Sequence, residues 1–75
     1  MNAVGLMMNV DEKKLSAVLK ILPSLKSPTI SDLSRKGWFD IFTVLREEIA
    51  RDIIPKLKEA GAQGIVEFPL NKIID

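Results

Sequence analysis

Side chains capable of chemistry are few in this chain of 75 residues, which contains no histidine and no cysteine. Without them the usual general base, the commonest transition-metal ligand, the thiolate nucleophile and the disulfide are all missing. The serines therefore lack the usual activating partner, and a Ser–Lys pair without a supporting motif is a weak substitute. Two carboxylates on predicted strands, Asp40 and Glu67, could form an acid–base pair, although solvated outward-facing side chains explain them more simply. The residues themselves indicate no enzyme.

Two short motifs could instead contact a small ligand. Gly61 and Gly64 lack the spacing of a phosphate-binding loop and follow a predicted helix, so a helix cap and a tight entry into a strand explain them. Ser27-Pro28-Thr29 holds a rigid proline between two hydroxyl residues, which can direct backbone amides and side-chain oxygens toward a polar ligand. From local chemistry alone, a turn that leads into a strand is the simpler interpretation.

Length, charge and hydropathy narrow the class of protein. A chain of 75 residues fits a single domain, 1–75. Eleven Lys and Arg against ten Asp and Glu leave a net charge of +1, and the mixed signs along the chain disfavour a nucleic-acid partner. No apolar run approaches the ~20 residues of a membrane-spanning helix, and the first ten residues lack a charged leader. We therefore expect a cytoplasmic protein with no membrane partner.

The spacing of apolar residues predicts elements in the order β-α-β-β-α-β. Asp11 is a candidate N-cap for the first helix, and Pro23 ends that helix. Pro55 predicts a kink in the second helix, which Gly61 caps. The expected strands are 4–10, 29–34, 38–45 and 64–68, with a turn at 35–37, and the expected helices lie between residues 11 and 23 and over about 47–60.

This order predicts an α+β fold, the ferredoxin-like βαββαβ sandwich, in which a four-stranded antiparallel sheet carries two helices on one face. The other face of such a sheet is open. Both faces of the strands at 4–10 and 38–45 are substantially apolar, whereas a sheet with one wet face alternates cleanly. We therefore expect another subunit or domain to cover the open face.

Several segments together resemble one known family, and Leu-Pro-x-Leu-x-Ser-Pro-Thr is the most specific of their motifs. The segments are residues 6–10 (Leu-Met-Met-Asn-Val), 21–29 (Ile-Leu-Pro-Ser-Leu-Lys-Ser-Pro-Thr), Gly37-Trp38, 57–65 (Leu-Lys-Glu-Ala-Gly-Ala-Gln-Gly-Ile) and 69–74 (Pro-Leu-Asn-Lys-Ile-Ile). In this order and spacing the chain is similar, over essentially its whole length, to the C-terminal regulatory domain of the long form of ATP phosphoribosyltransferase, the first enzyme of histidine biosynthesis.

The resemblance implies a regulatory domain with the ferredoxin-like fold, similar in shape to trimeric nitrogen-regulatory signal proteins. It implies L-histidine as a feedback inhibitor bound near a subunit boundary. The implied partners are L-histidine, further copies of the chain in a dimer, trimer or hexamer, and the catalytic domains of the parent enzyme. Those domains bind ATP, phosphoribosyl pyrophosphate and magnesium, so the resemblance implies no cofactor and no catalytic residue within these 75 residues.

The resemblance also maps a histidine site onto six positions. They are Asn9 after the first strand, Leu25, Ser27 and Thr29 in the following loop, Val44 on the third strand and Gly64 at a close backbone approach. A zwitterion with an imidazole ring needs hydrogen-bond acceptors and donors, which Asn9, Thr29 and the backbone offer. Structural roles compete, since Asn9 could cap a helix and Val44 could belong to the core. Many relatives carry histidine or another polar residue near Phe42, which puts polar contacts from this strand in doubt.

Two alternatives to a histidine-binding domain remain at this stage. The domain could be an oligomerisation module whose ligand site is incomplete. It could also be an RNA-binding sheet, because RNA-recognition modules share the topology, but such a surface needs aromatic and basic residues that the chain supplies poorly.

Overall fold

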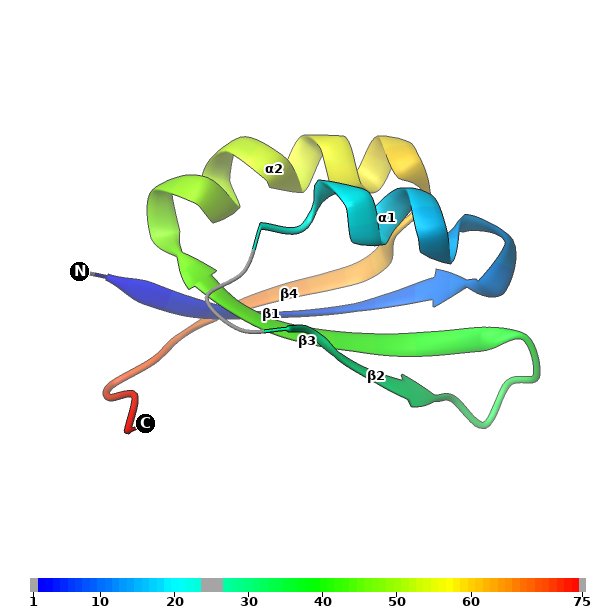
Figure 1. The fold of residues 1–75 in the computed structure, drawn as a ribbon, viewed down its shortest axis with the longest axis horizontal. Coiled ribbons are helices and arrows are strands. Elements are labelled where there is room, and N and C mark those ends of the chain that lie inside the picture. Colours follow the sequence, from blue (N-terminus) through cyan, green and yellow to red (C-terminus); the bar gives the residue numbers. More distant parts are fainter. Residues whose placement is uncertain (1, 24–26, 75) are drawn as a thin grey trace.

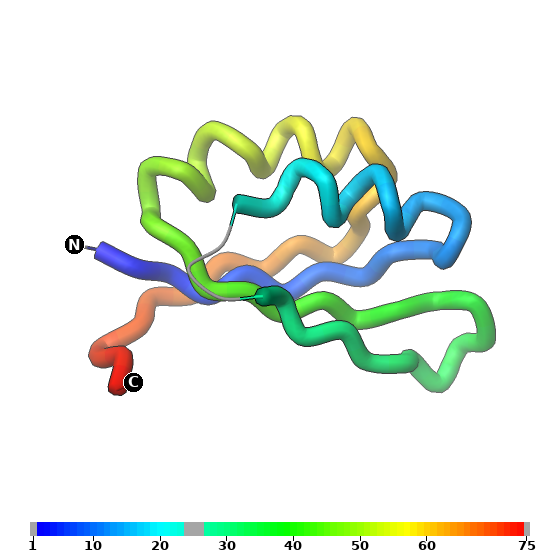
Figure 2. Tube along the Cα trace, viewed as in Figure 1, coloured from blue at the N-terminus to red at the C-terminus, as the bar shows by residue number. Residues whose placement is uncertain are grey.

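The computed structural model describes residues 2–23 and 27–74 of the chain. Its elements are β1 (Ala3–Asp11), the 3-10 helix η1 (Glu12–Lys14), α1 (Leu15–Ile21), β2 (Thr29–Asp32), β3 (Trp38–Arg46), α2 (Glu47–Ala60) and β4 (Gln63–Pro69). Both helices lie on the same face of the sheet and leave the other face open (Figure 1). They run side by side over the strands, as the trace of the chain shows (Figure 2).

The four strands form one antiparallel sheet in the order β2-β3-β1-β4. This order confirms the predicted ferredoxin-like fold. The central strands β1 and β3 are each paired on both sides, whereas β2 and β4 are the edges. In the middle of the sheet Met7 lies opposite Phe42 on one side and Val66 on the other. The pairing of β1 with β4 shifts register between Met7 and Asn9.

The core lies between the sheet and the two helices. Alternate residues of β1 and β3 point into it, as the period of two along a strand requires. Its fully buried side chains include Leu6, Met8 and Val10 of β1, Ile41 and Leu45 of β3, Val18 of α1 and Leu57 of α2. Because these positions are apolar and the helices cover them, the core fixes which face of each strand remains open.

The first helix differs from its prediction at its start. Asp11 accepts a hydrogen bond from the backbone N–H of Lys13 at 3.0 Å, which confirms the predicted cap. The turn that it caps is a 3-10 turn, and the α-helix begins only at Leu15. Short 3-10 turns are common at helix starts, where the chain must tighten as it leaves a strand. The helix ends at Ile21, two residues before Pro23, as predicted.

The second helix runs from Glu47 to Ala60 and continues past Pro55, whose predicted kink stays a prediction. Gly61 caps this helix with φ 114°, in the left-handed region that glycine favours. The Gly61 N–H donates to the Lys58 carbonyl at 3.1 Å, and the Ala62 N–H donates to the Leu57 carbonyl at 2.9 Å. These two bonds define a Schellman motif and confirm the predicted cap.

Within residues 2–23 and 27–74, no helix is long and apolar enough to cross a membrane.

Candidate functional site

The sheet face opposite the helices has an apolar half and a polar half. The pairing of the strands fixes both sets of residues. The apolar half consists of Gly5, Met7, Phe42, Val44, Val66 and Phe68. The polar half consists of Asn9, Asp11, Ser31 and Asp40, with the Trp38 ring opposite Asp11 at its end. Met7 is 38% exposed and Val66 is 54% exposed, so the apolar half lies open in the single chain. The prediction that the open face is apolar is confirmed for this half, and its cover stays a prediction.

Two aromatic rings lie at the centre of the apolar half. The rings of Phe42 and Phe68 are stacked, with centroids 5.9 Å apart and an interplanar angle of 17°. They stand on β3 and β4, and β1 passes between those strands. Phe68 lies over Gly5, because a Cβ atom at Gly5 would be 2.5 Å from the ring. Phe42 therefore contributes apolar packing to this face.

Asn9 and Gly64 form one group of the predicted site residues. Asn9 is half-buried and lies opposite Asp40 on β3 and Gln63 on β4. Gly64 has φ 57° beside the register shift, so the left-handed backbone there favours glycine. A Cβ atom on Gly64 would lie 3.5 Å from Nδ2 of Asn9, which shows how closely the Asn9 amide approaches this backbone. The cap of the turn that follows β1 is Asp11, not Asn9.

Ser27, Thr29 and Val44 form a second group, on β3 and on the edge strand β2 with the residues that precede it. Thr29 is exposed at the start of β2 and pairs with Phe42. Ser27 is exposed and precedes the start of β2 by two residues, while the half-buried Val44 lies on β3 opposite Gly5. Leu25, the sixth predicted position, lies outside the described residues.

The two groups do not meet within one chain. Thr29 stands on one edge strand and Gly64 on the other, so three strand spacings, about 14 Å in total, separate them. Asp40 and Phe42 of β3 lie between Asn9 and the edge that carries Thr29.

Asp40 and Glu67 do not form the acid–base pair that the sequence left open as the less simple interpretation. Asp40 lies opposite Asn9 on the open face. Glu67 lies opposite the buried Leu6 and therefore points to the helix side of the sheet. Because the sheet separates the two carboxylates, they cannot act on one substrate. What the sequence reasoning missed is the place of Asp40 beside Asn9, which depends on a strand register that the sequence does not specify.

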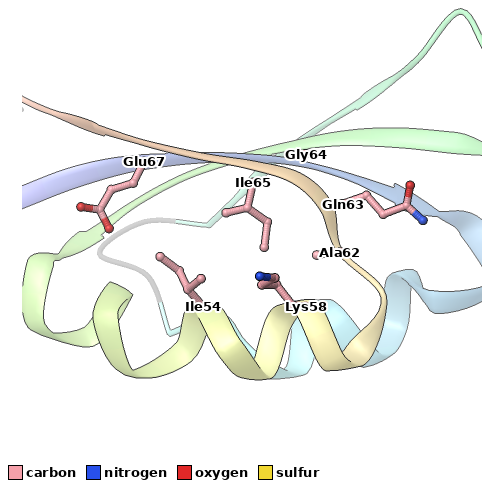
Figure 3. A pocket seen from close by; sticks show the side chains of 7 residues that line it. All are labelled: Ile54, Lys58, Ala62, Gln63, Gly64, Ile65 and Glu67. Carbon is pink, nitrogen blue, oxygen red and sulfur yellow. The ribbon is translucent and has the colours of Figure 1, made fainter.

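A hollow of about 510 Å³ lies between α2 and the edge strand β4. The side chains of Ile54 and Lys58 on the helix and of Ile65 and Glu67 on the strand reach toward it (Figure 3). Gly64 also lines the hollow, and it is the only predicted site residue that does so among those described. The part of the chain that the structure describes contains no cluster of three or more acidic side chains placed to hold a metal ion.

Comparison with known proteins gives consistent matches over nearly the whole chain. Residues 1–72 match the family model described as HisG, C-terminal domain. An ATP phosphoribosyltransferase of Solibacter usitatus (strain Ellin6076) is 59% identical over 71 residues, which cover 95% of this chain and 25% of that protein. The ATP phosphoribosyltransferase of Desulforudis audaxviator (strain MP104C) is 53% identical over 73 residues, or 97% of this chain and 25% of that protein.

A third relative, ATP phosphoribosyltransferase 1 of Geobacter sulfurreducens (strain ATCC 51573 / DSM 12127 / PCA), is 51% identical over 71 residues, or 95% of this chain and 24% of that protein. The chain thus spans about a quarter of the length of these curated relatives. The match to a C-terminal domain family confirms the resemblance seen in the sequence.

Proposed function

Because the chain belongs to the family of the HisG C-terminal domain, we propose that it is a regulatory domain that binds L-histidine between copies of itself. The relatives that share this domain are ATP phosphoribosyltransferases, enzymes of histidine biosynthesis. The chain would let L-histidine, the end product of the pathway, control the ATP phosphoribosyltransferase activity. The partners that respond to effector binding would be the catalytic domains of the parent enzyme, which bind magnesium.

One observation carries the proposal of a shared site. Asn9 and Gly64 lie toward one edge of the open face, while Ser27, Thr29 and Val44 lie toward the other. Residues that contact the same small ligand from opposite edges require two copies of the chain. We place the histidine between the β4 side of one copy and the β2 side of the next.

The chemistry of the two groups suits the ligand when they are combined. Asn9 offers an amide oxygen and an amide N–H₂, and the register shift at Gly64 leaves backbone groups next to it. Thr29 offers a hydroxyl that can donate and accept, and Val44 offers an apolar wall for the imidazole ring. The first group adds an amide and backbone groups to the hydroxyl and the apolar wall of the second group.

The arrangement also predicts how the copies associate. A contact between the β2 edge of one copy and the β4 edge of the next is head-to-tail, and such contacts close into rings when the rotation permits. The apolar half of the open face would be buried in the same assembly, which supports self-association. An effector held between copies stabilises one arrangement of the ring. The free energy that couples effector binding to a change at a second site is typically about 1–3 kcal/mol.

Calorimetric titration with L-histidine tests the proposal, with sedimentation to establish the oligomer. We expect the assembled chain to bind L-histidine, and the single variants Asn9→Leu and Thr29→Val each to bind it at least tenfold more weakly. Loss of one neutral hydrogen-bond partner of the bound ligand accounts for an effect of this size. Absence of binding by the assembled wild-type chain would contradict the proposal.

Mixed oligomers test whether the site is shared. When the Asn9→Leu and Thr29→Val chains are unfolded and refolded together, some junctions combine the native Asn9 of one copy with the native Thr29 of the next. We expect these mixtures to regain part of the high-affinity binding that each variant lacks alone. If both groups served a site within one chain, the mixture would bind no better than its components.

The apolar open face favours one second candidate, an oligomerisation module that does not bind the effector. In that case sedimentation would show an assembly while the titration with L-histidine stayed flat.

A further inference from the structure

We propose that Asp40 supplies the negative charge that binds the ammonium group of the amino-acid effector. This inference rests on the proposed function and adds a residue to its site. Its first support is position. Asp40 is the third residue of β3 and lies on the open face, directly opposite Asn9 of β1 and opposite Ser31 of β2. Directly opposed residues have Cβ atoms about 4.5–5.5 Å apart, so a group that contacts Asn9 is within reach of Asp40.

The second support is the charge that the other site residues lack. Asn9, Ser27, Thr29, Val44 and Gly64 are all uncharged. A free amino acid carries an ammonium group, and hydrogen bonds between oppositely charged groups are roughly twice as strong as neutral ones. A site built from the uncharged positions alone would bind the ammonium group only through neutral acceptors. The carboxylate of Asp40 provides the missing partner.

The third support is that Asp40 is available. The residue is half-buried, yet it forms no hydrogen bond or ion pair with any residue that the structure describes. The other carboxylate on this half of the face, Asp11, is engaged in capping the turn after β1. The guanidinium group of Arg35 lies over the Trp38 ring, 4.5 Å from its centroid. The Asp40 carboxylate is therefore free to form a charge-assisted hydrogen bond with a ligand ammonium group.

The residues beside Asp40 can orient the ligand through further hydrogen bonds. Asn9 and Ser31 flank the carboxylate on adjacent strands, and each can donate a hydrogen bond to it or accept one from the ligand. The ammonium group would therefore lie above the polar half of the face, with the imidazole ring extending toward the apolar wall. This orientation predicts that ligands without an ammonium group lose the contribution of Asp40 entirely.

The test compares Asp40→Asn with wild type in calorimetric titrations of two ligands. L-histidine carries the ammonium group, and imidazolepropionate is the same molecule without it. We expect Asp40→Asn to weaken L-histidine binding about tenfold or more and to change imidazolepropionate binding less than twofold. Asp32→Asn is the matched control, because Asp32 is an exposed carboxylate on β2 that lies opposite Phe39 rather than on the open face. Circular dichroism and sedimentation establish that each variant is folded and assembled.

The outcomes separate this inference from the proposed function. If wild type binds L-histidine and Asp40→Asn binds it equally well, Asp40 has no role and the regulatory proposal stands. If Asp40→Asn weakens both ligands by the same factor, the residue acts on something other than the ammonium group, and the inference is wrong. If wild type binds neither ligand, the proposed function fails and this inference fails with it. The variant Asp40→Glu, which keeps the charge, should retain more affinity for L-histidine than Asp40→Asn.

Discussion

Thr43 is a buried polar residue among the apolar side chains of the core. Its position on β3 faces the helices, opposite Leu6 of β1, and its side chain is 2% exposed. The hydroxyl oxygen Oγ1 is buried and has no hydrogen-bond partner among the described residues. Burying a hydroxyl without a partner costs about 1–3 kcal/mol in proteins, because it loses its bonds to water. The fold therefore carries an unfavourable polar group at a site where its neighbours are apolar.

Replacing this hydroxyl by a methyl group should stabilise the protein. Thr43→Val keeps the shape and the β-branching of the side chain, so we expect the free energy of unfolding in urea to rise by about 1 kcal/mol. Thr29→Val is the matched control, because Thr29 is the other threonine of the chain and is exposed. Its effect on stability should stay within about 0.5 kcal/mol. A Thr43→Val protein that is no more stable than the control would show that the hydroxyl finds a partner in solution.

At the scale of elements, much of the fold was predictable because local physics determines it. The strands and helices follow from apolar periodicity, and the caps Asp11 and Gly61 act where their side-chain and backbone properties predict. The candidate site was less predictable. The separation of Asn9 from Thr29, and the approach of Asn9 to Gly64, depend on strand register and on one register shift. Pairing between segments distant in the chain decides both, and no local pattern encodes them.

Gly5 of β1 packs against the Phe68 ring of β4. Mutations can show whether the glycine is required by the ring or by the backbone. The backbone of Gly5 does not need glycine, since its φ is not positive, but a Cβ atom there would lie 2.5 Å from the Phe68 ring. We expect Gly5→Ala to displace the ring from its stack with Phe42 and to lower the free energy of unfolding by about 1 kcal/mol. Urea unfolding measures this loss.

The same substitution should have the opposite sign once the ring is removed. In a Phe68→Ala background the space above Gly5 is free, and alanine is favoured over glycine in a strand by about 0.5–1 kcal/mol. Gly5→Ala should therefore be stabilising in that background, which makes the two effects strongly non-additive. Equal losses in both backgrounds would mean that the glycine is required by the backbone and not by the ring.

At the scale of the whole molecule, two features of the single chain indicate that several copies assemble. The apolar half of the open face is exposed, with Val66 54% and Met7 38% accessible. The predicted ligand positions are divided between the β1–β4 side and the β2–β3 side of the sheet. Assembly of several copies would bury the apolar half and complete the ligand site together. A chain of 75 residues also has a small core, so association would add to its stability.

Val66 offers the most direct test of this dependence on assembly. It stands beside Met7 at the centre of the apolar half, so a charged side chain there would have to be desolvated in any assembly that covers the face. We expect Val66→Glu to weaken self-association about tenfold or more in sedimentation equilibrium, while its exposed position leaves the folded chain intact. Ile74→Glu is the matched control, because Ile74 is 79% exposed after the end of β4. If Val66→Glu assembled as wild type does, the open face would lie outside the interface. The copies would then have to meet through the sheet edges alone, and the shared ligand site would survive the loss of the apolar contact.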